Sequence, residues 1–409
     1  VVGGITFDEW GVDGGRLCVL NAIDAIEHGA RVHVHTNVDS IHRLRSDDGR
    51  EDRYIVNARD QFTQTRMRLS ARVVVNATGA WSPLTAALGG LPQARVRVRP
   101  GKGIHVVLER RMSNYGILSE AIDGRQIFIY PWQNVTLLGT TDDDYYGDLD
   151  EVRATSEEVR YLVQGVARVF PSVRRARAIG TYASVRPTLY AYGANEDALS
   201  REHEIVDHAR DGARGVYSMI GGKLASYRLF AQDLSDCVAA RHFHLQVPCS
   251  THIAQLPGGG PVPDALELAN RSGITPVAAR RLIYRHGTRA LRVLDRAARR
   301  SCERDVTCPC EPVLEAEVRH VVREEMACTV DDVSRRTRLG LGACGGMRCA
   351  ARCGQIVAEE RGLAPREGLT MATEFLVRQA KTRMVALGPE QARQEALTLA
   401  HVRASLGDP

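Results

Sequence analysis

The stretch VYSMIGGKLASYRLFAQDLSDCVAA, residues 216–240, decides the fold class of this chain. A five-residue strand runs into two glycines, and a helical pattern starts near Lys223. The N-terminus of a helix carries free N–H groups and about half a positive charge, which stabilise an anionic group. The turn therefore suits a nucleotide cofactor, although an ordinary strand–turn–helix connection would show the same pattern.

Strand and helix patterns alternate around this stretch, over residues 1–250. Leu17–His28 predicts a helix, and RVHVHTNVDSI (31–41) alternates as a strand. Arg72–Asn76 is a short apolar strand that runs into ATG (77–79), a turn of small residues where backbone can approach a nucleotide closely. This alternation predicts an α/β fold.

The segment from about 94 to 142 is rich in strand patterns instead. It contains RVRV, IHVVL, QIFIY and VTLLGTT, with PWQN (131–134) as a hairpin turn. LPGGGPVP (256–263) is the clearest linker, and helical patterns follow it. VLEAEVRHVVREEMA (313–327) has its apolar residues on one face, and Thr329 begins a capping box. We therefore expect an inserted, mostly antiparallel β domain and an all-α C-terminal region.

The bulk composition is typical of a soluble globular protein. The 409 residues leave room for two or three domains, and 44% hydrophobic and 25% charged residues are ordinary values. The net charge of +5 suits an anionic small substrate or an acidic membrane surface and requires neither. Neither a signal peptide nor a membrane-spanning run is visible, and we expect no nucleic-acid partner.

Seven of the ten cysteines lie between residues 302 and 353, which favours a metal site in a reducing compartment over a disulfide framework. Four of them form a C-x-C pair and a C-x4-C pair, separated by 33 residues: Cys308 and Cys310, then Cys344 and Cys349. Thiolates suit zinc, which would be structural, or an iron–sulfur cluster, which would carry electrons. Glycines in GLGACGGMRC (340–349) would let backbone approach a cluster. Buried free cysteines are the alternative. We favour core packing for the remaining three of this group, Cys302, Cys328 and Cys353, although Cys353, four residues after Cys349, could substitute as a ligand.

The segment Gly340–Gly345 also matches the dinucleotide-loop spacing G-x-G-x-x-G. A dinucleotide loop must follow a strand and open a helix, whereas this segment follows the helical pattern DDVSRRTR and contains Cys344. We therefore do not interpret it as a nucleotide site, and the chain contains no other copy of the pattern.

Three basic residues stand where chemistry could take place. His105 follows a glycine turn in GKGIHVV, Arg186 precedes Pro187 in YASVRPTL, where we expect a turn, and Lys223 stands at the GGK turn. A histidine in a strand is more often structural, and an arginine beside a proline usually lies at the surface. Taken alone, these residues do not define a site.

The chain resembles FAD-dependent glycerol-3-phosphate dehydrogenase, a family of the D-amino-acid oxidase superfamily of flavoproteins. The resemblance rests on six stretches in the family's order: ITFDEWGVDGGRL (5–17), NATGAW (76–81), GKGIHVV (101–107), YPWQNVTLLGTTDDDYYGD (130–148), ASVRP (183–187) and GGKLASYR (221–228). Residues 314–342 resemble the family's helical C-terminal domain. The cysteine pairs resemble the [2Fe-2S] domain of the bacterioferritin-associated ferredoxin type, which is fused to the large subunit of the anaerobic enzyme.

This resemblance implies how the chain is divided. The parts are a truncated, Rossmann-like FAD-binding domain (1–90 and 200–250), an inserted β-rich substrate-binding domain (91–199), a linker (251–263), a helical C-terminal domain (264–306), a helical [2Fe-2S]-binding domain (307–365) and a helical tail (366–409). Family members begin with a βαβ unit that carries G-x-G-x-x-G, and this chain starts beyond it, so we expect a fragment or a gene model without its start. VDGGR (12–16) also departs from the family, which commonly has an acidic residue and an alanine before this arginine.

The resemblance also implies roles for individual residues. Val38 would meet the adenine side of FAD through its backbone. The cofactor would be lined by Asn76, Ala77, Thr78 and Gly79, and its isoalloxazine would be faced by Gly221, Gly222, Lys223 and Leu224. The substrate would be surrounded by His105, Arg186 and Lys223, with Arg228 and Thr141 beside it. The [2Fe-2S] cluster would be held by Cys308, Cys310, Cys344 and Cys349.

The expected reaction is oxidation of sn-glycerol 3-phosphate to dihydroxyacetone phosphate. His105 would take the hydroxyl proton, Arg186 would clamp the phosphate or the alkoxide, and Lys223 would add positive charge near the flavin. Electrons would pass from FAD through [2Fe-2S] to a quinone, directly or through partner subunits. The resemblance implies a cytoplasmic protein, either free or peripheral on the inner face of the membrane.

Two other interpretations stay open. The chain could be a related flavoprotein dehydrogenase of a 2-hydroxy acid such as 2-hydroxyglutarate, because pockets in this superfamily diverge. It could also be a non-catalytic fragment whose zinc or iron–sulfur module binds a partner subunit.

Overall fold

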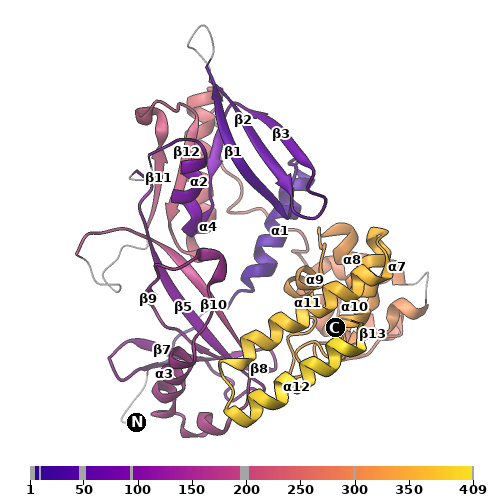
Figure 1. Ribbon diagram of the computed structural model, residues 1–409. Helices are drawn as coiled ribbons and strands as arrows, with labels where there is room; N and C mark the ends of the chain where they lie inside the picture. The colour runs from indigo at the N-terminus through magenta and orange to yellow at the C-terminus, as the bar shows by residue number, and fades with distance from the viewer. Residues whose placement is uncertain are drawn as a thin grey trace. The chain divides into compact units, whose positions relative to one another are not determined.

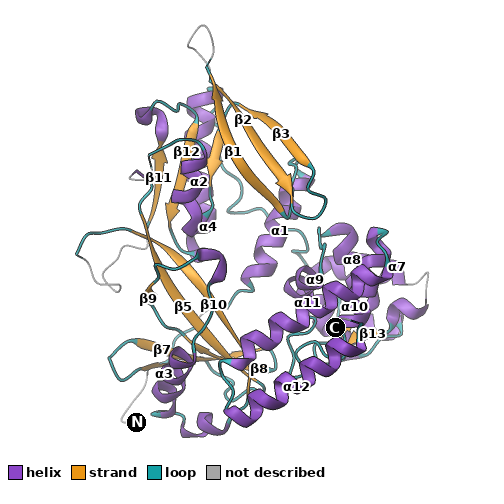
Figure 2. Ribbon diagram, in the orientation of Figure 1, coloured by secondary structure: helices purple, strands orange, loops and turns teal. Residues whose placement is uncertain are grey.

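The computed structural model describes residues 5–8, 11–45, 52–92, 95–193, 202–297 and 301–407. The chain forms two compact units, and their helices and strands are labelled in Figures 1 and 2. Unit 1 comprises Val1–Val32, Gln255–Ala380 and Arg393–Pro409, and unit 2 comprises His33–Ala254 and Lys381–Ala392. The six-part division expected from the sequence stays a prediction.

Unit 2 contains a small mixed sheet that positions two turns. Its strand order is β11 (His203–Asp207), β12 (Val216–Gly221) and β4 (Val74–Asn76). β12 runs antiparallel to β11 and parallel to β4. Because the carboxyl ends of parallel strands meet at one edge, the turn after β4 and the turn after β12 lie side by side. Helices α2 (Ser82–Leu88) and α4 (Tyr227–Val238) follow these turns.

A six-stranded antiparallel sheet forms the second part of unit 2. Its strands are β5 (Val98–Leu108), β6 (Ile117–Glu120), β7 (Gln126–Trp132), β8 (Val135–Gly139), β9 (Asp143–Asp144) and β10 (Ala178–Leu189). The order is β10-β5-β8-β7-β6, with β9 paired to β5. One face packs on α3 (Ser156–Ala167), where Ile104 and Leu138 join Leu162 in the core. Because side chains alternate across a strand, Gly103 and His105 belong to the opposite face.

A third sheet of unit 2 is antiparallel, in the order β1 (Thr36–Leu44), β2 (Arg53–Asp60) and β3 (Arg66–Ala71). The strand expected over residues 31–41 therefore begins only at Thr36. His35 has a φ of 49°, which a continuous strand does not allow, and its ring packs on Phe62. Pro187 also differs from expectation, because it lies within β10 instead of forming a turn. Since β10 is an edge strand, its ladder tolerates a proline.

Unit 1 is helical around one short ladder. Its helices are α1 (Gly14–Glu27), α5 (Ala265–Ser272), α6 (Pro276–His286), α7 (Ala290–Ala297), α8 (Glu315–Glu324), α9 (Val330–Thr337), α10 (Ala350–Arg361), α11 (Pro365–Met384) and α12 (Pro389–Ser405); the last two extend into the short segment that belongs to unit 2. The ladder pairs β13 (Val306–Cys308) with β14 (Val313–Leu314). Thr329 caps α9 in a capping box with Asp332, as the sequence predicts. The core of the unit includes Val318 and Phe375, both fully buried.

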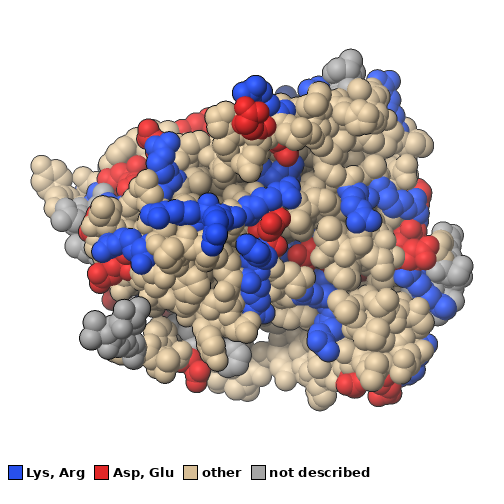
Figure 3. All heavy atoms as spheres, turned by 90° about the horizontal axis from the view of Figure 1, so that it is seen from below, with Lys and Arg blue, Asp and Glu red and all other residues tan. Residues whose placement is uncertain are grey.

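The surface carries mixed charge. Lys and Arg side chains gather in bands on the face shown in Figure 3, with acidic side chains among them, which agrees with the small positive net charge. No helix within the described residues combines the length and the apolar run that crossing a membrane requires.

Candidate active site and metal centre

The turn after β4 is held by a buried polar network. The side chain of Asn76 donates to the carbonyl of Ser82 (2.9 Å) and to the Ser218 hydroxyl (3.1 Å), and its oxygen accepts from the Thr78 hydroxyl (2.7 Å). Ser218 lies on β12 and contacts the fully buried His208 ring (2.9 Å), which in turn contacts Asp211 (3.0 Å). The network fixes Asn76 against β12 and leaves the following residues, Ala77 and Thr78, at the surface.

The turn after β12 requires its two glycines. Gly221 and Gly222 have φ values of 74° and 84°, which L side chains rarely adopt. A Cβ on Gly221 would also lie 2.3 Å from the carbonyl oxygen of Glu202. Lys223 and Leu224 follow and are exposed. Helix α4 begins at Tyr227, a little later than expected, because one 3-10 turn, η7 (Leu224–Ser226), comes first.

His105 lies on the open face of the six-stranded sheet. It pairs with Tyr182 on β10 and with Gly139 on β8. Its ring stacks on Tyr182, with centroids 4.6 Å apart, and lies 5.4 Å from Phe128. A Cβ on Gly139 would come within 2.4 Å of the imidazole Cδ2. The ring therefore lies directly over Gly139, between two aromatic side chains.

The surroundings of His105 keep the imidazole neutral. Its Nδ1 is buried and has no hydrogen-bond partner within the described structure. Burial, and then the charge of Arg186, lower the pKa of His105 to about 4. At neutral pH the ring can therefore accept a proton from a neighbouring group.

Arg186 lies on the same face and is held by the end of β8. Its Nη1 donates to Asp142 (2.9 Å) and to the carbonyl of Thr141 (3.3 Å), and its Nη2 donates to Thr140 (3.1 Å). A Cβ on Gly103 would lie 2.5 Å from Nη2, so that glycine makes room for the guanidinium. The side chain is thus fixed in place with donor groups to spare for an oxyanion.

The sequence DDD after this strand end binds three different arginines. Asp142 pairs with Arg186, Asp143 with Arg125 (2.9 Å), and Asp144 with both ends of the Arg99 fork (2.6 Å each). The fully buried Thr141 accepts a hydrogen bond from the backbone of Ile104 (3.1 Å). Thr141 therefore supports Arg186 through its carbonyl and ties the strand end to β5.

Strand β10 connects this sheet face to the glycine turn. Its last residue, Leu189, would contact a Cβ on Gly221 at 2.9 Å. The 3-10 turn η1 (Gly79–Trp81) contacts β5, β10 and β12. Arg186 is three residues before Leu189, about 10 Å along a strand. Unit 2 thus gathers His105, Arg186 and both turns in one region.

Two of the residues expected at the site, Arg228 and Val38, make their described contacts away from His105 and Arg186. The guanidinium of Arg228 donates to Gln232 on the same helix (2.8 Å) and to Thr251 in the segment that follows the helix (3.1 Å). Val38 is half-buried on β1, beside a bulge and next to an open hollow lined by His35, Thr36, Asn37, Arg59 and Gln61. Neither has a described contact with His105 or Arg186.

Four further residues shape this site and are not among those expected from the sequence: Gly103, Phe128, Gly139 and Tyr182. A glycine inside a strand pattern often marks a close approach, so Gly103 and Gly139 carried a usable signal. The two aromatic residues are recognisable only from the register of β5 with β10 and of β7 with β8.

The four cysteines of unit 1 come together as two pairs. The Cys310 and Cys344 sulfurs lie 3.8 Å apart, and the Cys349 thiol donates a hydrogen bond to Cys308. The first pair is half-buried and the second is buried. The hydrogen bond from Cys349 is the main factor that lowers the pKa of Cys308 to about 6, against the effect of burial. Backbone N–H groups of residues 340, 311 and 310 act in the same direction.

Local backbone shapes this centre. Cys308 ends β13, Cys310 lies in the β13–β14 turn, and Cys349 caps the N-terminus of α10. A Cβ on Gly342 would lie 2.4 Å from the Cys310 Cβ, so that glycine admits the second loop. As the sequence indicates, the segment Gly340–Gly345 follows α9 and not a strand. Cys353 is buried on α10, in the hydrophobic core.

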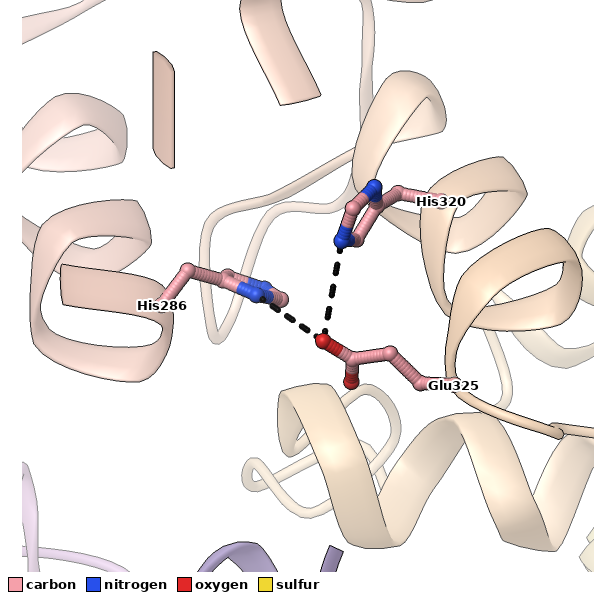
Figure 4. A group of neighbouring side chains, drawn as sticks. All are labelled: His286, His320 and Glu325. Carbon is pink, nitrogen blue, oxygen red and sulfur yellow. Dashed lines mark ion pairs between the residues drawn. The ribbon is translucent and has the colours of Figure 1, made fainter. Parts of the chain in front are cut away.

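A second group of metal-type ligands lies elsewhere in unit 1. Within the described residues, one group of three such side chains has all its donor atoms within 4.8 Å: His286, His320 and Glu325. Figure 4 shows both rings directed at the carboxylate, with distances of 3.5 Å from His286 Nδ1 and 3.6 Å from His320 Nε2. All three residues are buried.

This group already holds a cation. Arg16 Nη2 lies 2.9 Å from Glu325 Oε1 and 3.1 Å from His286 Nδ1, which is the place that a metal ion would take. Against the effect of burial, the neighbouring side chains of His286, His320 and Arg16 hold the pKa of Glu325 well below its usual range. Arg285 likewise pairs with Glu317 at 2.5 Å. Two arginines thus pair with two glutamates, and a divalent ion would have to displace a buried guanidinium.

Comparisons with known proteins agree with this architecture. Residues 1–228 match the family described as FAD dependent oxidoreductase, and residues 249–367 match the C-terminal domain of alpha-glycerophosphate oxidase. The chain is 29% identical to an anaerobic glycerol-3-phosphate dehydrogenase subunit of Haemophilus influenzae, over 92% of this chain and 65% of that protein. The Escherichia coli K12 protein of the same name is 30% identical, with 92% and 68% covered. The chain thus spans about two thirds of the length of these relatives.

The fold also resembles a solved structure. Glycerol-3-phosphate dehydrogenase from Bacillus halodurans, complexed with FAD, superposes with a TM-score of 0.73 at 24% identity, over 90% of this chain and 73% of that one. The expected fold class is confirmed: a mixed α/β part with sheets and a helical C-terminal region.

Proposed function

Because the chain belongs to the FAD-dependent glycerol-3-phosphate dehydrogenase family, we propose that it oxidises sn-glycerol 3-phosphate to dihydroxyacetone phosphate. The observation that carries the proposal is the pairing of a neutral, half-buried His105 with a fixed Arg186 on one sheet face. A base and an oxyanion clamp are the two groups that oxidation of a phosphorylated alcohol requires from the protein.

The chain's residues fit a flavin beside this face. Asn76, Ala77, Thr78 and Gly79 would line the cofactor, Val38 would meet its adenine side, and its ring would be faced by Gly221, Gly222, Lys223 and Leu224. The two left-handed glycines form a half-buried turn that L side chains rarely adopt, and the exposed Lys223 beside it adds positive charge. Bound FAD supplies the hydride acceptor for the C2 hydrogen of the substrate.

In this proposal, His105 accepts the substrate's proton and Arg186 binds its negative charge. His105 takes the hydroxyl proton on its neutral imidazole, and such a base contributes roughly 10²–10⁴-fold in rate. Arg186 binds the phosphate or the developing alkoxide with its remaining donors, while Thr141 and Asp142 keep the fork in place. Arg228 belongs to the substrate region in this proposal on the ground of the family resemblance alone.

We further propose that Cys308, Cys310, Cys344 and Cys349 would hold a [2Fe-2S] cluster, which would supply one-electron transfer to a quinone or to partner subunits. The arrangement in two pairs supports the cluster over zinc. A tetrahedral zinc site with Zn–S bonds of ~2.3 Å would bring all four sulfurs within ~3.8 Å of one another. No three of these sulfurs gather within 4.8 Å in the described structure, whereas two thiolates on each iron need only pairwise approach. Peripheral contact with a membrane that contains the quinone is part of the same proposal.

The test is anaerobic mixing of the purified, FAD-loaded protein with glycerol 3-phosphate, followed by the visible flavin spectrum. Bleaching with glycerol 3-phosphate but not with glycerol supports the proposal. A guanidinium fork also binds carboxylates, so 2-hydroxyglutarate is the competing substrate. Faster bleaching with 2-hydroxyglutarate would replace the proposed substrate. His105→Ala should lose bleaching while the exposed control His42→Ala retains it, and normal bleaching in His105→Ala would remove the base assignment.

A further inference from the structure

Glu311 follows the C-x-C pair directly and connects the cysteine centre to buried arginines. It is 1% exposed. Its backbone N–H donates to the Cys308 sulfur, and its carbonyl accepts from Arg285 Nη1 at 3.5 Å. Its carboxylate accepts from both Nε (3.2 Å) and Nη2 (3.4 Å) of Arg338. One residue therefore contacts a cysteine sulfur and two cations.

Arg338 reaches the same sulfur by a second route. It ends α9 in a left-handed conformation, with a φ of 66°, and is 9% exposed. Two residues later, the backbone N–H of Gly340 also donates to the Cys308 sulfur. The Glu311–Arg338 ion pair thus joins the two loops whose N–H groups meet at Cys308.

Arg285 fixes the first of these loops from the other side. Besides the carbonyl of Glu311, it binds the carbonyl of Pro312 at 3.0 Å. Arg285 itself is held by Glu317, and its own carbonyl accepts from Arg16 at 2.7 Å. The loop that carries Cys310 is therefore anchored in the buried ion network of unit 1.

We propose that Glu311 and Arg338 are positioning residues that set the reduction potential of the iron–sulfur centre. The proposal rests on the proposed [2Fe-2S] cluster. Reduction adds one negative charge to the centre. The carboxylate of Glu311 opposes that charge and the guanidinium of Arg338 favours it, while both side chains hold N–H donors against the Cys308 sulfur.

A merely structural ion pair would behave differently from this one. Removal of either partner of a structural pair loosens the same two loops, so both changes would move the potential in one direction or only lower the iron content. An electrostatic role instead predicts opposite shifts for the two single variants and near-cancellation in the double variant.

The experiment compares Glu311→Gln, Arg338→Gln and the double variant in the full chain, by redox titration of the cluster followed by electron paramagnetic resonance. We expect Glu311→Gln to favour reduction and Arg338→Gln to oppose it, each by about tenfold in the one-electron equilibrium, or ~59 mV. The double variant should lie within about threefold of the wild type. The matched control is Glu360→Gln, a carboxylate paired with Arg319 at 2.6 Å at the far end of α10. It should leave the potential unchanged.

The outcomes separate this proposal from the one on which it rests. If the wild-type chain binds zinc, or binds neither iron nor sulfide, both the proposed electron route and this proposal are wrong. If the wild type holds the cluster but the reduction potentials of the two single variants shift in the same direction, or do not shift, only the role of Glu311 and Arg338 is wrong. If a single variant retains less iron, recovery of iron in the double variant supports the pairing, and no recovery contradicts it.

Discussion

His105 and Tyr182 stack across neighbouring strands, with ring planes 9° apart and centroids 4.6 Å apart. The stacking follows from their direct pairing in the β5–β10 register. It holds the imidazole over Gly139, in the field of Arg186 and away from bulk water. The relationship explains how a strand histidine, usually a structural group, can serve as the neutral base that we propose.

The first prediction concerns the pH dependence of stability. The folded pKa of His105, about 4, is lower than its ordinary value of 6.5, so the unfolded chain binds the proton more tightly. The stabilisation that depends on the neutral ring is complete above pH 6.5 and is lost as the pH falls to about 4. The difference is on the order of 3 kcal/mol. Urea unfolding at several pH values should show a steeper acid loss for wild type than for His105→Gln. Equal slopes would contradict this.

The second prediction concerns the space under the imidazole. Gly139→Ala places a Cβ 2.4 Å from His105, so the ring must move, at a cost of roughly 1–3 kcal/mol in stability. We expect at least a tenfold loss in turnover of glycerol 3-phosphate, from displacement of the base. Gly180→Ala is the control, because its Cβ would meet only Thr382, at 3.6 Å. Equal activity in both variants would show that the ring position does not matter.

The third prediction concerns the guanidinium fork. Arg186→Lys keeps the charge but loses the paired hydrogen bonds, each worth about 1.5–3 kcal/mol to a charged partner. The KM for glycerol 3-phosphate should rise roughly 10–100-fold, by conversion of that energy. Steady-state kinetics with Arg177→Lys as a surface control would test this. An unchanged KM would place the phosphate elsewhere.

The fourth prediction concerns the buried ion network. Glu325→Gln leaves Arg16 buried beside a neutral partner, and breaking such a pair typically destabilises by about 3–5 kcal/mol. The exposed pair of Glu151 and Arg153 provides the control, because Glu151→Gln should change stability by less than about 1 kcal/mol. Denaturant unfolding measures both. Comparable small effects would show that Arg16 and Glu325 do not form a critical pair.

Local patterns predicted the local structure well. The strand–glycine–helix stretch became β12, its turn and α4, and the PWQN turn joins β7 to β8. The capping box at Thr329 is also present. Each of these depends on residues a few positions apart, so a sequence window contains the whole signal.

The long-range relationships could not be predicted in this way. Arg16 binds Glu325, a partner 309 positions away, and Arg285 is a member of the same network. Tyr182 reaches His105 only through strand register. These contacts depend on how elements pack, and no periodicity in the chain records that packing. The expected roles of Val38 and Arg228 rest on the resemblance alone and stay predictions.

We propose that one chain couples oxidation of glycerol 3-phosphate to reduction of its cysteine-bound cluster. The most direct measurement adds glycerol 3-phosphate anaerobically to FAD-loaded protein and records the electron paramagnetic resonance of the reduced [2Fe-2S] centre. We expect a signal in wild type, its loss in His105→Ala, and flavin bleaching without a signal in Cys308→Ser. A wild-type protein whose flavin is reduced while its cysteine centre stays silent would contradict this proposal.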